Sequence, residues 1–247
     1  MKRLLPMLVF IAGATYASTA YAGAPSAETI LEKAETIRNP QTDYVVGVEL
    51  TDTNRKGEKE TRVFKSLIKG RDKALVKFVK PEVDAGKKVL MVDTSMWVYM
   101  PQTAKPIRIS PKQKLAGNAA YGDITRLNFI GNYAAELKET KSVDGRKVHV
   151  LKLTAMKDRA VTYSQIEYHI DATSYRPLLV NYQTPRGKIL KAATFSDYQN
   201  VLGVQRPTEM RIEDKLNKSK VTVLKFRDAK KANLPDIMFE KQNLGRS

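Results

Sequence analysis

The chain has 247 residues and a formal net charge of +17 at pH 7, because 43 lysine and arginine residues outnumber 26 aspartate and glutamate residues. It has no cysteine, which excludes a disulfide framework, thiol catalysis and a lipid attached to an N-terminal cysteine. Nucleic acid is the usual partner of so basic a chain, but the basic residues are scattered along the sequence rather than gathered in one tail.

The first predicted element is a secretory signal peptide over residues 1–22. Lys2 and Arg3 form its basic start, residues 4–14 form a short apolar run, and small residues precede a cleavage site after Ala22. An uncleaved membrane anchor is the alternative, but the apolar run is shorter than a membrane-spanning helix requires. We therefore expect an exported protein. For an exported chain of bacterial type, anionic lipid head groups or acidic polysaccharide are the expected partners of the basic charge, rather than nucleic acid.

The mature chain, residues 23–247, is predicted to be one domain that begins with a helix over residues 26–38. Ile30, Leu31 and Ala34 fall on one face of this helix, and Ser26 is a plausible N-cap. Short strands separated by tight turns follow, which indicates a curled antiparallel sheet. The predicted strands are residues 44–51, 60–69, 74–80, 88–92, 95–100, 134–141, 147–154, 164–170, 178–183, 191–198, 208–213 and 220–227.

Several predicted strands are apolar on both faces. Residues 96–100 place methionine and valine on one face and Trp97 and Tyr99 on the other. A half-solvated antiparallel strand would instead alternate apolar and polar residues, so these strands must be covered on both sides. The helix at residues 26–38 and the region 118–132 are the candidates for this cover. Methionine and aromatic side chains suit a surface that accepts flexible apolar ligands, although an ordinary core is the common alternative.

A basic segment follows these apolar strands. No acidic residue occurs between Thr94 and Gly122, whereas four cationic side chains do. This charge predicts contact with anionic head groups or with an acidic surface of a partner protein. The four residues are Lys105, Arg108, Lys112 and Lys114.

Catalytic and metal-binding motifs are scarce. The sequence lacks the nucleophile, phosphate-binding, zinc-binding and dinucleotide-binding motifs, and its two histidines, His149 and His169, lie inside predicted strands. Asp123 stands out among the acids, with helix capping as its simplest role. We expect no enzyme activity, no metal and no cofactor. A pair of carboxylates acting on envelope polymers is the alternative that remains open.

Two segments resemble the LolA-type periplasmic lipoprotein carriers. The stretch VLMVDTSMWVYMPQ, residues 89–102, is similar to their apolar strand, aspartate turn and Trp-x-Tyr-x-Pro strand. The stretch KPIRISPKQKLAGNAAYGDITRLNF, residues 105–129, resembles a subgroup described as outer-membrane lipoprotein-sorting proteins. The matching elements there are Arg108-Ile109-Ser110, Gln113-Lys114, Gly117 and Tyr121-Gly122-Asp123-Ile124.

This resemblance implies a mainly β fold of the α+β class. It would be a strongly curved antiparallel half-barrel with helices covering the concave face. The implied function is a periplasmic carrier that binds acyl chains of lipoproteins or lipids in a hydrophobic cavity for transfer toward the outer membrane. An inner-membrane transporter and an outer-membrane acceptor would be its partners. The predicted cavity lining is Phe64, Phe78, Met91, Trp97 and Tyr99, and the predicted head-group or partner contacts are Arg71, Lys105, Arg108, Lys112 and Lys114.

Two departures from the classical carriers keep an alternative open. Those carriers have an Arg-Pro whose arginine helps to latch the lid, whereas this chain has Gly70-Arg71-Asp72 without a proline. The basic segment after Pro101 is also an insertion relative to them. The alternative function is a non-catalytic accessory subunit that docks on an envelope transporter through this basic loop.

Overall fold

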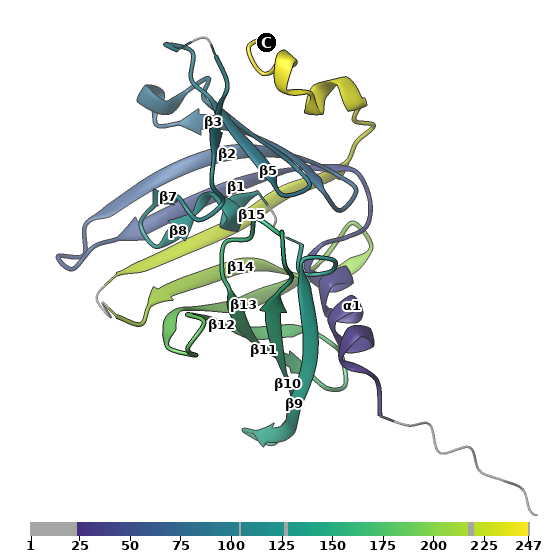
Figure 1. The fold of residues 1–247 in the computed structure, drawn as a ribbon. Helices are drawn as coiled ribbons and strands as arrows, with labels where there is room; N and C mark the ends of the chain where they lie inside the picture. The colour runs from purple at the N-terminus through teal and green to yellow at the C-terminus, as the bar shows by residue number, and fades with distance from the viewer. Residues whose placement is uncertain (1–23, 104, 126–127, 217–219, 247) are drawn as a thin grey trace, which may run out of the picture.

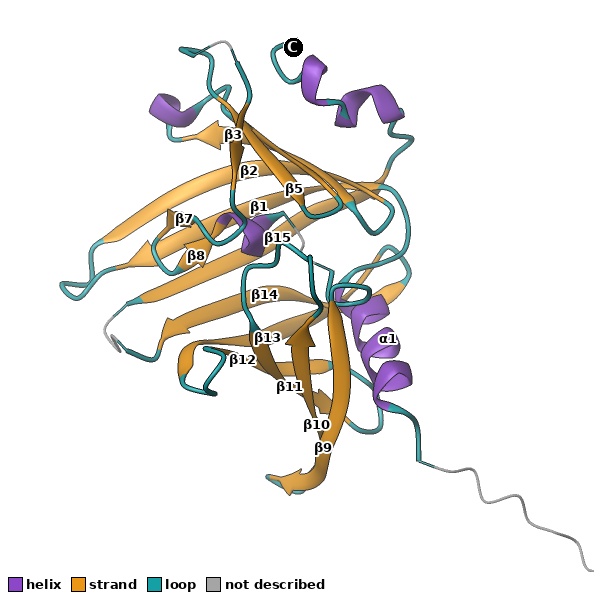
Figure 2. Cartoon of the chain, in the orientation of Figure 1, coloured by secondary structure: helices purple, strands orange, loops and turns teal. Residues whose placement is uncertain are grey.

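The computed structural model describes residues 24–103, 105–125, 128–216 and 220–246. The predicted signal peptide, residues 1–22, lies outside the described residues. Most of the described chain forms one 13-stranded antiparallel sheet that bends strongly without closing into a barrel (Figures 1 and 2). The predicted mainly β class is therefore confirmed, and so is the antiparallel arrangement.

The strands form two meanders that meet at the centre of the sheet. The first meander runs outward from the centre to one edge: β1 (Tyr44–Thr53), β2 (Lys59–Lys69), β3 (Lys73–Lys80), β4 (Lys88–Val92), β5 (Ser95–Tyr99) and β6 (Ile107–Ile109). The second returns from the opposite edge: β9 (Tyr133–Val143), β10 (Arg146–Ala155), β11 (Gln165–Asp171), β12 (Pro177–Gln183), β13 (Ile189–Val201), β14 (Val204–Asp214) and β15 (Val221–Lys231). The sheet becomes continuous where β15 pairs with β1. All twelve predicted strands are confirmed, with ends shifted by a few residues.

The chain crosses from one sheet edge to the other between β6 and β9. This crossing segment, residues 110–132, contains β7 (Lys114–Ala116), β8 (Ala119–Ala120) and the short α2 (Tyr121–Ile124). Its apolar side chains are buried in the cluster that fills the inner face of the sheet. The predicted helical cover of the concave face needs correction, because helices cover only a small part of it and much of the cover is this irregular segment.

The N-terminal helix α1 (Ala27–Arg38) forms as predicted. Ser26 is its N-cap, and the Ser26 side chain accepts a hydrogen bond from the backbone N–H of Thr29 at 3.2 Å. Ile30 and Ala34 are fully buried against the inner face. Because α1 contacts β9, β12 and β14, it covers the part of the sheet that the second meander forms.

The outer face of the first meander carries a second apolar cluster. Leu75 and Leu90 are buried there, and Trp97 packs beside them. The C-terminal segment, residues 232–246, covers this cluster with two short 3-10 helices, η2 (Asp236–Phe239) and η3 (Lys241–Asn243). The expectation that both faces are covered is thus confirmed, although the sequence pattern did not identify the C-terminal segment as the outer cover.

We predict that the substitution Phe239→Ala destabilises the protein by about 3–5 kcal/mol, because Phe239 is 4% exposed and anchors the outer cover. Urea unfolding followed by circular dichroism gives the free energy, and the emission of Trp97 should shift to longer wavelength. Ile237→Ala on the same short helix is the control. Ile237 is 60% exposed, so its loss should change stability by less than about 0.5 kcal/mol. Equal effects of the two substitutions would contradict this role of the C-terminal segment.

Candidate ligand cavity

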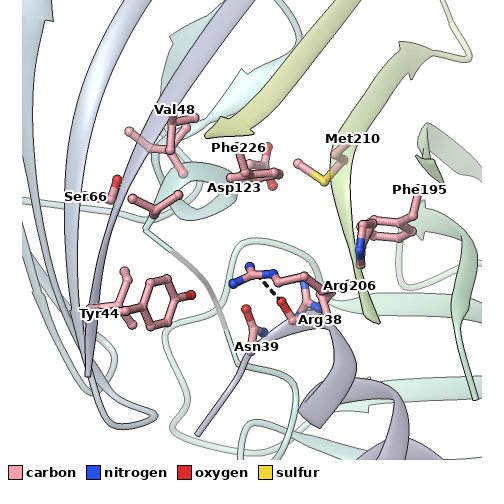
Figure 3. A pocket seen from close by; sticks show the side chains of 14 residues that line it. Arg38, Asn39, Tyr44, Val48, Ser66, Asp123, Phe195, Arg206, Met210 and Phe226 are labelled. Atoms are coloured by element: carbon pink, nitrogen blue, oxygen red, sulfur yellow. Dashed lines mark hydrogen bonds between the residues drawn. The ribbon is translucent and has the colours of Figure 1, made fainter. Parts of the chain in front are cut away.

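A cavity lies between the inner face of the central strands and the elements that cover it (Figure 3). The C-terminal end of α1 and the α2 turn form the cover here, and the wall comes from β1, β2, β13, β14 and β15. The cavity holds about 60 Å³ of free space, which is room for a few water molecules. Its apolar wall includes Val46, Val48, Ile68, Ile124, Phe195 and Met210.

A buried ion pair at the end of α1 connects the helix to the crossing segment. The guanidinium of Arg38 donates to both carboxylate oxygens of Glu35 at 2.7 and 2.8 Å, and Glu35 is fully buried. Glu35 Oε2 also accepts a hydrogen bond from the backbone N–H of Phe129 at 3.1 Å. The Arg38 guanidinium lies 4.1 Å from the centre of the Phe129 ring. These contacts attach α1 and the crossing segment to each other.

Asp123 holds the α2 turn in place. Its carboxylate accepts hydrogen bonds from the backbone N–H of Ala120 at 2.8 Å and from the hydroxyl of Tyr163 at 3.1 Å. Helix capping, expected from the sequence, is therefore one of its roles. Burial raises the pKa of Asp123 above its ordinary value, and the positive charge of Lys191 opposes this shift without cancelling it.

The middle of the crossing segment is seated on the pair β1 and β15. The backbone N–H of Asn118 donates to Thr222 Oγ1 at 2.8 Å, and its side-chain amide donates to the carbonyl of Lys220 at 2.8 Å. Gly117 has a φ of 50°, and a Cβ there would lie 2.0 Å from Asp52 Oδ1. The close approach of backbone to strand therefore requires glycine at this position.

The five predicted cavity residues do not come together. Phe64, Phe78 and Met91 lie on the inner face and are at most 4% exposed, and the rings of Phe64 and Phe78 meet edge to face at 4.8 Å. Trp97 and Tyr99 lie on the outer face, in the cluster under the C-terminal segment. None of the five lines the cavity of Figure 3.

Four of the five predicted docking cations belong to the basic segment around the edge strand β6. Their side chains are exposed before, on and after β6, and Arg108 donates to Ser95 Oγ at 3.3 Å. Arg71 is also exposed, and it donates to Gln41 Oε1 at 2.5 Å in the connection after α1. The exposed cations of the segment are Lys105, Arg108, Lys112 and Lys114.

Arg206 and Ser66 are cavity residues that the sequence analysis missed. Arg206 comes from β14 and Ser66 from β2, and each lies in an ordinary strand pattern without a recognisable motif. Their one sequence signal is a polar residue on the inward face of a strand. Arg206 shares that face with Thr208 and Met210, which are also buried. The alternation of residues along β14 reveals that Arg206 faces inward only after the register of the strand is known.

Each histidine contacts a polar side chain of its own strand or of the neighbouring strand. His149 Nδ1 lies 2.8 Å from Thr140 Oγ1, and His169 Nε2 lies 2.6 Å from Glu167 Oε1. Within the part of the chain that the structure describes, no group of three or more histidine, cysteine or acidic side chains is arranged to hold a metal ion. Among the same residues, no helix is both long enough and apolar enough to cross a membrane.

Comparison with known proteins decides the family. A family model described as "-like: Uncharacterized protein" matches residues 70–246. The structure is similar to that of a LolA superfamily protein from Nitrosomonas europaea, with a TM-score of 0.83 and 35% sequence identity over 89% of this chain and 99% of that chain. The chain belongs to the LolA superfamily. The resemblance inferred from residues 89–129 is therefore confirmed.

Two further structures are similar to this chain. A putative outer membrane lipoprotein-sorting protein domain from Vibrio parahaemolyticus is 26% identical, with a TM-score of 0.75 over 90% of this chain and 98% of that chain. A DUF1329 family protein from Desulfovibrio piger shares the fold at 23% identity, with a TM-score of 0.76 over 89% of this chain and 99% of that chain. No curated protein sequence matches the chain.

We predict that Asp123→Asn changes how stability depends on pH. Because the pKa of Asp123 is raised in the folded chain, the folded state keeps a proton that the unfolded state has lost. This contribution to stability is complete below about pH 4 and is lost as the pH rises through the folded-state pKa. Relative to wild type, the variant should therefore gain stability between about pH 4 and pH 7, as measured by urea unfolding.

Asp236→Asn is the control of opposite sign. Hydrogen bonds from Lys73 and Lys69 lower the pKa of Asp236, so its contribution is present above the unfolded pKa and is lost as the pH falls. That variant should lose stability relative to wild type as the pH rises from about 3 to 6. Parallel curves for Asp123→Asn and wild type would show that Asp123 has an ordinary pKa.

Proposed function

We propose that this LolA-superfamily chain is a periplasmic carrier that shields the acyl chains of a lipid or lipoprotein and carries them toward the outer membrane. The observation that carries the proposal is the cavity between the inner face of the sheet and its cover, whose wall is largely apolar. The name of the Vibrio parahaemolyticus relative, a lipoprotein-sorting protein domain, supports it. Cleavage of the signal peptide after Ala22 would release the mature carrier into the periplasm.

The size of the cavity implies that the cover moves when cargo binds. About 60 Å³ is too little for an acyl chain, so the cover must separate from the wall. When the cover separates, the apolar side chains of Ile124 and Phe129 move away from the inner face of the sheet, and the acyl chain takes their place. The inner face of the sheet is covered by apolar groups both before and after the acyl chain binds. Because burial of apolar area contributes roughly 25 cal/mol per Å² in both states, replacing the cover by the acyl chain costs little free energy. The polar contacts of Glu35, Asn118 and Asp123, at about 0.5–1.5 kcal/mol each, would set the closed position.

We further propose that the basic segment orients the carrier at a membrane or at an acidic partner. Each exposed cation contributes about 1 kcal/mol near an anionic surface, which favours encounter more than retention. An inner-membrane transporter and an outer-membrane acceptor are the partners that such a carrier needs. The accessory-subunit alternative uses the same surface. Replacing Lys105, Arg108, Lys112 and Lys114 together tests the two functions. Complete loss of docking with intact lipid binding favours the accessory subunit, whereas a carrier should still deliver its lipid, with slower encounter.

We predict that the mature protein, purified from the periplasm without detergent, carries a stoichiometric lipid or acylated peptide in native mass spectrometry. Phe226→Asp should lower lipid binding about tenfold or more, because it places a charge at the cavity wall. Phe226 is only partly buried, so the fold should tolerate the change. Phe226→Leu is the matched control and should bind as wild type does. Wild-type protein that stays free of lipid after incubation with envelope-lipid vesicles would overturn the proposal.

A further inference from the structure

Arg206 is a buried cation without an acidic partner. It is 6% exposed, and among the described residues no carboxylate forms an ion pair with it. Nη2 donates to the backbone carbonyl of Arg38 at 3.1 Å, and the guanidinium lies 5.4 Å from the centre of the Tyr44 ring. Nη1 is buried and meets no acceptor among the described residues. A buried charge without a counter-charge lowers the stability of the fold unless another group compensates it. The position of Arg206 therefore indicates that a ligand supplies the missing negative charge.

Ser66 presents a second unused polar atom in the same cavity. It is 2% exposed on β2, and its hydroxyl has no hydrogen-bond partner in the described part of the chain. Figure 3 shows the guanidinium of Arg206 and the ring of Tyr44 directed toward each other across the cavity, with Ser66 on the same wall as Tyr44. Two polar atoms without a hydrogen-bond partner in one cavity are unusual, because most buried polar groups are hydrogen-bonded.

The other charges of the cavity are already engaged. Arg38 is paired with Glu35, and the carboxylate of Asp123 accepts from the backbone of Ala120 and from Tyr163. Arg206 is therefore the charged group of the cavity wall that lacks a counter-charge in the described residues. An anion bound beside it would supply that charge, and the planar guanidinium suits the two oxygens of a carboxylate or phosphate.

Arg206 also lies at the boundary between this cavity and a second cleft, which we call the Arg206 threshold. Val46, Arg206 and Phe226 line both the cavity and an adjoining, more polar cleft of about 260 Å³. The wall of this cleft carries charges of both signs, namely Lys225 and Arg227 together with Asp197, Glu209 and Asp228. Lys225 pairs with Glu209 at 3.8 Å, whereas Arg206 forms no ion pair with any carboxylate among the described residues. A ligand seated here would have one end among apolar side chains and the other among polar groups. This arrangement fits an amphiphile whose charged head lies at the threshold and whose tail extends into the cavity.

We propose that the Arg206 threshold binds the oxyanion of an acidic amphiphile, a carboxylate or phosphate head group, with the Arg206 guanidinium as its main donor and the Ser66 hydroxyl as a second donor. The inference rests on the proposed carrier function and narrows its cargo. An acidic lipid is selected over a neutral lipid of the same chain length, and a free anion without a tail binds weakly because it leaves the apolar wall unused.

The test compares decanoate with decanol, which differ only in the head group, by calorimetric titration of the lipid-free mature protein at pH 8. We expect decanoate to bind at least tenfold tighter to the wild type. Arg206→Met should abolish this preference while leaving decanol affinity within about threefold. Arg206→Lys keeps the positive charge but lacks the planar guanidinium that can donate to two oxygens at once, so this variant should retain part of the preference for decanoate over decanol. Arg211→Met removes an exposed cation from the same strand and should change neither affinity.

Each outcome separates the two proposals. Equal affinity for decanoate and decanol in the wild type, or a preference that survives Arg206→Met, overturns the Arg206 inference and leaves the carrier function standing. Acetate binding as tightly as decanoate shows a site for free anions and also overturns the inference. Failure of the wild type to bind either amphiphile contradicts the carrier function itself. Circular dichroism checks that each variant is folded. If a variant is not folded, the comparison of decanoate with decanol in the wild type alone tests the Arg206 inference.

Discussion

Strands β3, β4 and β5 of the first meander are apolar on both faces, and the rest of the structure depends on covering both. A strand of this kind exposes large hydrophobic area to water unless another layer lies on each side. The chain meets this constraint with two unrelated covers. The crossing segment and α1 close the inner face, and the C-terminal segment closes the outer face. Residues far apart in sequence are therefore brought over the same few strands.

The two covers are attached in different ways, and this difference matters for function. Phe239 and Leu244 fasten the outer cover by burying apolar area against Leu90, and its ion pairs through Asp236 are exposed and contribute little. The inner cover also buries apolar side chains such as Ile124 and Phe129, but directional hydrogen bonds at Glu35, Asn118 and Asp123 position it around a cavity that remains partly unfilled. Hydrogen bonds that can be exchanged for water, next to an incompletely filled apolar wall, suit a surface that opens and closes.

The sequence predicted local structure well and spatial grouping less well. Helix α1, its cap at Ser26 and every long strand were recoverable because period and turn signals are local. The strands β6, β7 and β8 were missed because two or three residues are too few to show a pattern. Trp97 and Tyr99 were grouped with Met91 because they are close in sequence, yet alternation along adjacent strands sends them to the opposite face. Arg206 was missed because its place in the cavity becomes visible only when β14 is packed beside residues from α1, β1 and β2, which are far away in the sequence.

The pairing of β1 with β15 has a consequence for how the chain folds as it is synthesised. The strand that completes the sheet is made last, so β1 keeps an open hydrogen-bonding edge until the C-terminal residues arrive. The outer apolar face stays uncovered for the same interval, because residues 232–246 follow β15 directly. A chain that is synthesised from its N-terminus thus passes through a stage with one meander formed and both a strand edge and a hydrophobic face exposed. Protection against aggregation at that stage has to come from the charged side chains along the strands or from helper proteins, which gives the large excess of lysine and arginine a role before folding is complete.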